Sequence, residues 1–203
     1  MCSSDLPDSQ RDPAAINDGE KGVIIVWTDK GGGSFDIYAQ RMNVNGQFLW
    51  LKDGVPVCQT GMTQQRPRLT PTEPGQCFIV WEDFRFGAWD IFAQVLNSQG
   101  RIGISQEGTQ VCMAAGTQYN PCLIRHEKNA IVAWEDYRSG NHYDVYMQAL
   151  NFDGGRVWHD GGVPIAFDAR LPQLLSLGRN EFIAAWEDCR GGNRSIAAQK
   201  FKL

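Results

Sequence analysis

Residues 76–83 read QCFIVWED, and three similar segments recur along the chain: GVIIVWTD at 22–29, NAIVAWED at 129–136 and EFIAAWED at 181–188. The tryptophans of the four segments are 54, 53 and 52 residues apart, at Trp27, Trp81, Trp134 and Trp186. Self-similarity at a fixed spacing of this length indicates a repeat architecture. We therefore interpret the chain as four copies of one structural unit.

Other residues repeat at fixed distances from these tryptophans. A proline precedes each tryptophan by 13 or 14 residues, at Pro13, Pro67, Pro121 and Pro172. A short apolar run follows each one and ends at Gln40, Gln94, Gln148 and Gln199. The turn signals NVNG, NSQG and NFDG come next in the first three units, before a run of the type VPVC. The fourth unit reaches Leu203 before this last run.

The runs within each unit are rich in Val, Ile, Tyr, Phe and Trp and are separated by Gly, Asn, Asp or Pro, a pattern typical of strands. Four short antiparallel strands in about 50 residues make one propeller blade, which buries its faces against neighbouring blades. We predict an all-β propeller of four four-stranded blades, the last without its outer strand. We expect the blades at about 13–58, 67–112, 121–166 and 172–203.

Four blades can close a ring alone or form part of a larger one, and we favour part of a larger propeller. A stack of separate small sandwiches is the alternative, but it would need linkers that the sequence does not show. Residues 1–12 fall outside the repeats. Because Cys2–Leu6 resembles the translation of a sequencing-adapter end, we interpret 1–12 as either a non-native stretch or a natural polar leader.

Composition excludes several classes of protein. The chain has 203 residues and a formal net charge of -4, which disfavours a nucleic-acid binder because such a protein needs a basic surface. Its longest apolar runs are about five residues, far short of the roughly 20 that a membrane helix needs. The composition does not indicate a particular activity.

The stretches Trp81–Asn97 and Trp134–Asn151, with the pattern W-E-D-x-R-x-G-x-x-D-I-Y-A-Q, resemble tandem repeats of bacterial secreted and surface proteins, many of them Bacteroidetes-like. The resemblance covers residues 13–203. It implies a β-propeller and a secreted or cell-surface location, and it implies no reaction.

The Glu-Asp pairs of the repeat point to structure rather than catalysis. Adjacent residues on a strand face opposite ways, so the two carboxylates of a pair do not share a site. In addition, a protein needs an active site only once, whereas these pairs recur in the repeat. In the Asp-x-Arg triplets, Asp83, Asp136 and Asp188 are expected to lock the following turn together with Arg85, Arg138 and Arg190. An oxygen-lined cation site at each loop is the alternative. However, the first unit breaks the Asp-x-Arg pattern, because its aspartate is followed by Lys30 and then by a glycine.

Aromatic and basic side chains gather between the second and third runs of each unit. Loops of this kind often carry function, and exposed aromatics beside arginine suit sugar stacking or protein contacts. The alternative is that the aromatic residues preceding the third run pack between blades. The ligand-binding candidates are Arg85, Phe86, Trp89, Tyr137, Arg138, His142 and Tyr143.

The remaining polar chemistry gives no catalytic or metal motif. The three histidines do not lie at metal-ligand spacing, and no nucleophile or phosphate-binding motif occurs. The sequence predicts no metal, cofactor or catalytic residue. Cys58 and Cys112 occupy equivalent positions where the third unit has Ala166, so we expect small buried residues with free thiols.

These observations lead to a prediction of function. We expect a non-catalytic binding module of a secreted or cell-surface protein, with a glycan or a protein as its partner. A propeller-type glycoside hydrolase or lyase is one alternative, and a structural spacer is another. An open blade edge would also permit self-association, since an unpaired strand edge is a template for pairing.

Overall fold

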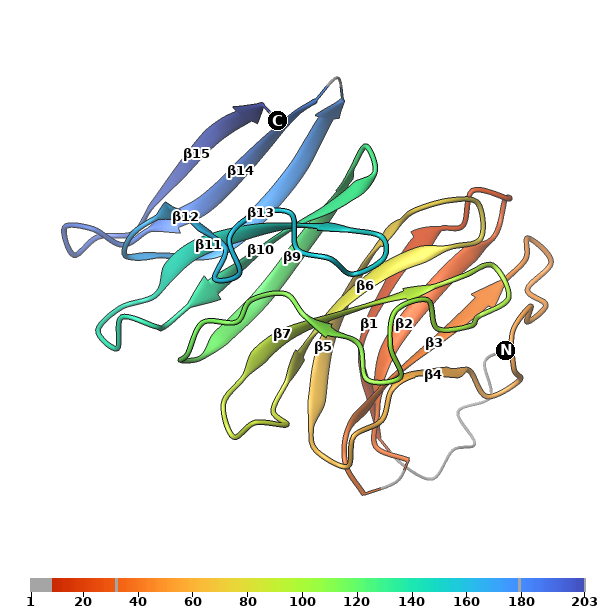
Figure 1. The fold of residues 1–203 in the computed structure, drawn as a ribbon. Helices are drawn as coiled ribbons and strands as arrows, with labels where there is room; N and C mark the ends of the chain where they lie inside the picture. Colours follow the sequence, from red (N-terminus) through yellow and green to blue (C-terminus); the bar gives the residue numbers. More distant parts are fainter. Residues whose placement is uncertain (1–8, 32, 179, 203) are drawn as a thin grey trace.

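The computed structural model describes residues 9–31, 33–178 and 180–202, in which every regular element is a β-strand (Figure 1). The strands form three sheets of four strands and one sheet of three, each an antiparallel meander in chain order. This confirms the predicted all-β class, the four blades and the lack of an outer strand in the fourth. The adapter-like residues 2–6 lie outside the described residues.

The strand bounds follow the repeat. Blade 1 consists of β1 (Gln10–Asn17), β2 (Val23–Asp29), β3 (Asp36–Met42) and β4 (Val55–Cys58). Blade 2 consists of β5 (Gln64–Pro71), β6 (Cys77–Asp83), β7 (Asp90–Leu96) and β8 (Thr109–Gln110). Blade 3 consists of β9 (Gln118–His126), β10 (Asn129–Asp136), β11 (Asp144–Asn151) and β12 (Val163–Ala166). Blade 4 consists of β13 (Ala169–Gly178), β14 (Glu181–Asp188) and β15 (Ser195–Lys202).

The blades follow one another as a fan, with blades 1 and 4 at its two ends (Figure 1). The first strand of each blade is the innermost, and β1, β5, β9 and β13 lie side by side around a common axis. Residues of these four strands line an axial cavity of about 410 Å³. The described residues form no helix that is long and apolar enough to cross a membrane.

The packing of the blades explains why the apolar run in each second strand is continuous. Its alternate side chains face opposite neighbours, because successive residues of a strand point to opposite faces. Ile79 and Trp81 pack towards blade 1, whereas Phe78 and Val80 pack towards blade 3, and all four are fully buried. We call the side that carries the tryptophan the front face of a blade and the opposite side its back face.

The Asp-x-Arg triplet forms the predicted turn-locking network. In blade 2, Trp81 Nε1 donates to Asp83 at 2.9 Å, and Arg85 Nε and Nη2 donate to the same carboxylate at 2.9 and 2.6 Å. Arg85 also stacks over Phe92, 3.9 Å from the ring centroid. Blade 3 repeats this arrangement around Asp136, with Arg138 as donor.

Cysteine side chains join this network from the preceding blade. Arg85 Nη2 lies 3.2 Å from Cys58 Sγ, and Arg138 Nη2 lies 3.3 Å from Cys112 Sγ. Both cysteines are buried, and the five cysteines of the described chain are free thiols. Burial raises the pKa of the Cys58 thiol to about 12, although Arg85 opposes the shift. A thiol of this kind is unreactive at neutral pH.

The repeated glutamine has a structural reason that the sequence pattern did not reveal. Gln94 Nε2 donates to the carbonyl oxygen of Ser105 at 2.6 Å, while its Oε1 accepts from the backbone N–H groups of Val95 and Ile104. Gln148 makes the same three bonds in blade 3. One buried amide therefore fixes the connection between the third strand and the outer strand.

The residue before each repeated proline adopts a left-handed backbone conformation. Its φ angle lies between 48° and 55° in all four blades, at Asp12, Arg66, Asn120 and Leu171. The pairing register of the first strand with the second shifts at this same place in every blade, which marks a bulge. The bulge turns the beginning of each inner strand and sets the shape of one end of the axis.

Replacing Leu171 by asparagine should raise the free energy of unfolding by about 0.5–1 kcal/mol. Leucine rarely adopts a left-handed conformation, whereas asparagine tolerates it, and Leu171 is 45% exposed, so little packing is lost. Urea denaturation of the two proteins measures the difference. A Leu171→Val variant is the matched control and should be less stable than the parent, because β-branching worsens the strain; equal stability of all three would contradict the argument.

Candidate functional site

One end of the axis presents a different side chain from each blade. These side chains belong to the left-handed residues at the bulges, Asp12, Arg66, Asn120 and Leu171, which together we call the axial mouth. Arg66, Asn120 and Leu171 line the axial cavity, and Asp12 holds the equivalent position on β1. The repeat gives every blade the same backbone geometry at this end, but the side chain at this position differs from blade to blade.

Two buried carboxylates lie directly behind the axial mouth. Glu82 accepts hydrogen bonds from Gln65 Nε2 and from the backbone N–H of Asn120, both at 2.8 Å. Arg66 Nη1 lies 3.5 Å from the same carboxylate and 3.1 Å from Asn120 Oδ1. Glu82 is 0% exposed, so it orients mouth residues from behind and is shielded from a ligand.

Glu135 repeats this role one blade further on. Its carboxylate accepts from Asn120 Nδ2 at 2.8 Å and from the backbone N–H of Leu171 at 2.9 Å. Arg170 Nε donates to it at 3.3 Å, and Glu135 is also 0% exposed. Each glutamate thus binds the bulge of the following blade, and Asn120 connects the two carboxylates.

Asp12 is the mouth carboxylate that solvent reaches. Its side chain is 32% exposed, and the hydroxyl of Thr28 lies 3.4 Å from its Oδ2. Thr28 stands in blade 1 where blades 2 and 3 have Glu82 and Glu135. Arg11 Nε lies 3.5 Å from Asp12, so positive charge is close to this carboxylate.

A row of aromatic side chains runs beside the mouth from blade 2 to blade 3. The ring centroids of Trp89 and Tyr119 are 6.3 Å apart, those of Tyr119 and Tyr143 are 6.3 Å apart, and those of Tyr143 and Tyr137 are 4.8 Å apart. Arg170 stacks over Tyr143 at 4.5 Å. Burial raises the pKa of Tyr119, with Tyr143 and Glu82 adding to the effect. Aromatic faces beside arginine suit the stacking of sugar rings.

The structure divides the predicted ligand-binding residues. Trp89, Tyr137 and Tyr143 lie in the aromatic row, and Trp89 also reaches Tyr119 of the next blade. Arg85 and Arg138 are held by the turn-locking network. The remaining two lie at the edge of the loops: Phe86 is 65% exposed, and His142 Nδ1 lies 2.9 Å from Asp144.

The residues of the mouth itself escaped the sequence analysis. Asp12, Arg66, Asn120 and Leu171 differ in type, so a search for repeated residues passes over them. The available signal was their constant position, one residue before each repeated proline. Across residues 9–31, 33–178 and 180–202, no cluster of three or more His, Cys, Asp or Glu side chains could hold a metal ion.

Asp90, the first residue of β7, has a raised pKa. Asp90 lies opposite Asp83 in the register of β6 and β7. Burial raises the pKa of Asp90 to about 6, and the negative charge of Asp83 adds to the rise, while Arg85 opposes it. The charged form of Asp90 is therefore disfavoured in the folded protein.

Replacing Asp90 by asparagine should remove a pH-dependent loss of stability. The folded pKa of Asp90 lies above its unfolded value, so its stabilising contribution is complete below about pH 4 and is lost as the pH rises through 6. We expect the parent to lose about 1–2 kcal/mol relative to Asp90→Asn between pH 4 and pH 7, after allowance for solvent screening. Urea denaturation at several pH values tests this, and parallel curves for the two proteins would refute it.

Comparisons with known proteins show which solved structures share this fold. The endo-arabinase of Bacteroides thetaiotaomicron is 11% identical, with a TM-score of 0.61 over 99% of this chain and 78% of its own. A thermostable family-43 glycoside hydrolase is 13% identical, with a TM-score of 0.54 over 94% of this chain and 71% of its own. The α-L-arabinofuranosidase of Fusarium graminearum is 12% identical, with a TM-score of 0.57 over 98% of this chain and 64% of its own.

Identities of this size establish the fold, which these neighbours share as five-bladed propellers. No protein-family model matches the chain, and no curated protein matches it. The expected non-catalytic binding module is corrected by these comparisons, because the similar structures are glycoside hydrolases. The sequence argument weighed only the carboxylates that repeat, and it therefore left out Asp12, which occurs in one blade.

Proposed function

We propose that the protein is a propeller-type glycoside hydrolase that acts on arabinose-containing glycans at the axial mouth. The observation that carries the proposal is the convergence, at one end of the axis, of an exposed carboxylate, arginine side chains and an aromatic row. The arabinan-directed activities of the similar structures suggest the sugar. A polymeric substrate also fits the extracellular location that the repeat pattern implies, which we retain as part of the proposal.

The residues of the mouth divide the work by their exposure. Glycosidic hydrolysis by the usual route needs a carboxyl group that acts on the anomeric carbon or on its attacking water, and an acid that protonates the leaving oxygen. We assign Asp12 to the first role, because it is exposed and lies beside Arg11. Glu82 and Glu135 are positioning residues that hold Asn120 and the neighbouring arginines. Trp89, Tyr119 and Tyr143 form the platform on which sugar rings stack.

Hydrolysis of aryl α-L-arabinofuranosides tests this assignment. An aryl leaving group departs without protonation, so the reaction isolates the role of Asp12. We expect the purified protein to release the phenol from substrates of one to three sugar units and to release arabino-oligosaccharides from arabinan. Asp12→Asn should lower the rate of phenol release by about 100-fold or more while leaving the melting temperature unchanged.

Matched variants separate catalysis from binding. Trp89→Ala should weaken arabino-oligosaccharide binding, measured by calorimetry, about tenfold. Phe86→Ala is the control, because Phe86 is exposed and lies outside the aromatic row, and it should leave binding unchanged. If the protein hydrolyses neither the aryl arabinosides nor arabinan, or if Asp12→Asn retains full activity, the proposed function is wrong.

A further inference from the structure

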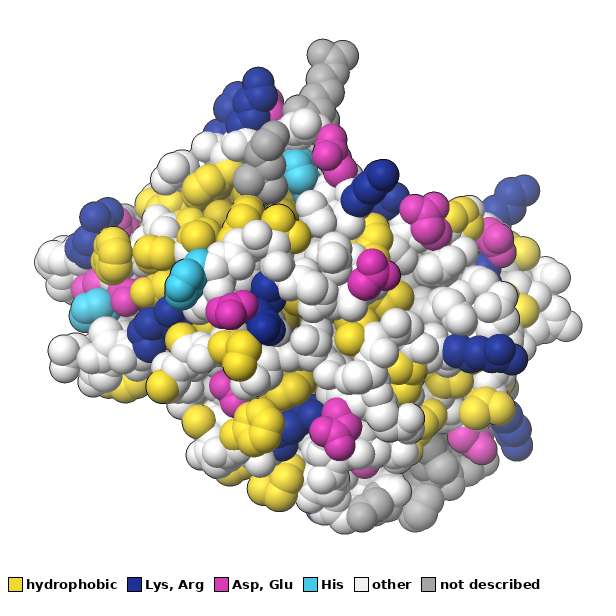
Figure 2. Space-filling model, viewed as in Figure 1, with side chains coloured by type: hydrophobic (Ala, Val, Ile, Leu, Met, Phe, Trp, Pro, Cys, Tyr) yellow, Lys and Arg dark blue, Asp and Glu magenta, His cyan; other side chains and the backbone are white. Residues whose placement is uncertain are grey.

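The wall of the axial cavity carries positive charge and no carboxylate. Arg66 and Arg68 of β5 both line the cavity, and its other polar side chains are the amides of Asn120 and Gln173 and the thiol of Cys122. No aspartate or glutamate of the described residues lines it. The outer surface is different, because basic and acidic side chains are interspersed on the face shown in Figure 2. The cavity therefore separates the two signs of charge where this surface mixes them.

Arg68 is the arginine whose charge the described residues do not balance. Its side chain is exposed, Nη1 donates to the carbonyl oxygen of the preceding residue at 2.9 Å, and it forms no ion pair with a described carboxylate. Arg66, by contrast, lies 3.5 Å from the buried Glu82. Burial raises the pKa of the Cys122 thiol to about 12, although Arg68 opposes the shift, so this thiol is uncharged at neutral pH. An anion that enters the cavity would balance the charge of Arg68.

Arg68 holds a position at which every blade has a different residue. It follows the repeated proline directly, and the equivalent residues are Ala14, Cys122 and Gln173. All four side chains line the cavity. Blade 1 packs beside blade 2 through β1 and β5, and its small alanine leaves space next to the arginines. The variable positions of the inner strands thus bring two guanidinium groups and open space to the same side of the axis.

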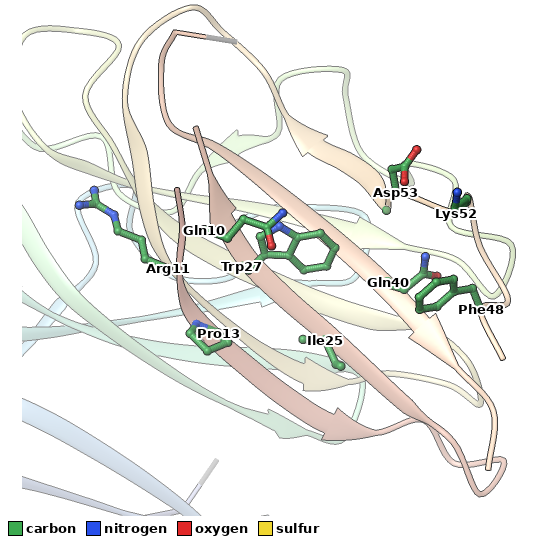
Figure 3. Close-up of a pocket in the computed structure, with 10 residues that line it drawn as sticks. Gln10, Arg11, Pro13, Ile25, Trp27, Gln40, Phe48, Lys52 and Asp53 are labelled. Carbon is green, nitrogen blue, oxygen red and sulfur yellow. The ribbon is translucent and has the colours of Figure 1, made fainter. Parts of the chain in front are cut away.

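A third arginine adds positive charge where blades 1 and 2 meet. The front face of blade 1 has an open, largely apolar groove of about 300 Å³, which Figure 3 shows bordered by Ile25, Trp27 and Phe48. Arg11 extends away from these three side chains in the same view. Its Nη2 donates to Gln65 Oε1 of blade 2 at 3.1 Å, next in the chain to Arg66. Basic groups of two blades therefore stand at this side of the axial mouth.

The size and walls of the cavity suit a sugar better than a free inorganic anion. Its volume of about 410 Å³ is within the roughly 300–1,000 Å³ of small-molecule sites, whereas one water occupies only about 30 Å³. Leu69 and Leu123 offer apolar surface to the C–H groups of a ring, and the amides of Asn120 and Gln173 can bond its hydroxyl groups. Asn120 and Arg66 also belong to the axial mouth, so a glycan bound there reaches the cavity directly.

We propose that the axial cavity binds an acidic sugar, a uronate residue of the glycan, with its carboxylate on Arg66 and Arg68. A guanidinium presents a planar fork of N–H donors that matches the two oxygens of a carboxylate. Arg68 then selects acidic glycans over neutral ones. The inference deepens the proposed function and rests on it for one point, which is that the uronate and the arabinose belong to the same glycan.

Calorimetry with methyl glucuronide and methyl galacturonide at neutral pH tests the site, and the methyl ester of each sugar is the uncharged comparison. We expect one of the acids to bind at least about tenfold more tightly than its ester, because hydrogen bonds to charged groups are the stronger ones. Arg68→Gln should reduce this difference to about twofold or less. Arg68→Lys keeps the charge but loses the fork, so it should lie between Arg68→Gln and the parent.

Arg101→Gln is the matched control for the change of charge. Arg101 is exposed and does not line the cavity, so its replacement should leave the difference between acid and ester unchanged. Equal affinity of the parent for acid and ester, or equal effects of Arg68→Gln and Arg101→Gln, would overturn the proposal. Sodium sulfate and sodium phosphate, each titrated alone, address the other occupant. Binding of either salt as tight as that of the uronide would mean that the cavity holds a free anion.

A polymeric substrate connects the site with the proposed activity. An arabinan that carries uronate residues should release arabino-oligosaccharides about tenfold faster than the same polymer after reduction of its carboxyl groups to alcohols, and equal rates would contradict a shared glycan. If aryl arabinosides are hydrolysed while acid and ester bind alike, the acidic-sugar site is wrong and the proposed function stands. If uronides bind through Arg68 while aryl arabinosides are not hydrolysed, the proposed function is wrong and the site stands.

Discussion

Replacing Glu135 by alanine should lower the free energy of unfolding by about 2–4 kcal/mol. The change removes the acceptor of three donors, Asn120 Nδ2, the backbone N–H of Leu171 and Arg170 Nε, and leaves a cavity behind the mouth. Buried donors that lose their partner carry their full desolvation penalty, and removing one member of a buried ionic contact is strongly destabilising. Denaturation in urea, followed by tryptophan fluorescence, measures the loss.

Glu187 provides a matched control for Glu135. The two residues hold the same position in adjacent blades, but Glu187 is partly exposed and bonds only Arg194 among the described donors. Glu187→Ala should therefore change stability by about 0.5 kcal/mol or less. Glu135→Gln keeps an acceptor for the Leu171 amide, so its loss of unfolding free energy should lie between those of Glu135→Ala and Glu187→Ala. Similar losses for Glu135→Ala and Glu187→Ala would show that the contact with the next blade contributes little.

The fold was predictable from the sequence because its determinants repeat. Four tryptophans at a constant spacing, each within a strand that is apolar on both faces, require equivalent blades whose two faces are both covered. The turn-locking role of Asp83 and Arg85 was predictable for the same reason. Blade 4 departs from the pattern. Asp188 pairs with Arg190 in an exposed setting, and Trp186 Nε1 has no hydrogen-bond partner among the described residues.

The site was less predictable because its residues vary from blade to blade. The identity of Asp12, Arg66 and Asn120 follows no pattern, and only the left-handed bulge before each proline brings them to one end of the axis. Tyr119 was missed because the aromatic search covered the loops between second and third strands, whereas Tyr119 lies on an inner strand. A repeat sequence therefore predicts the framework from its constant positions, and the candidate site from the variable positions between them.

Replacing Trp81 by alanine should cost about 3–5 kcal/mol, and the equivalent change at Trp27 should cost much less, about 1–2 kcal/mol. Trp81 is 0% exposed, stacks on Phe92 and packs against blade 1, so its removal leaves a large apolar cavity. Trp27 makes the same contacts within its own sheet, with Tyr38 and Asp29, but its outer side faces the open groove. The difference between the two losses therefore measures what a covering blade contributes to one tryptophan, because both positions share the same local geometry. Urea denaturation of the two variants gives this difference directly, and equal losses would mean that the front face of blade 1 is already covered in solution.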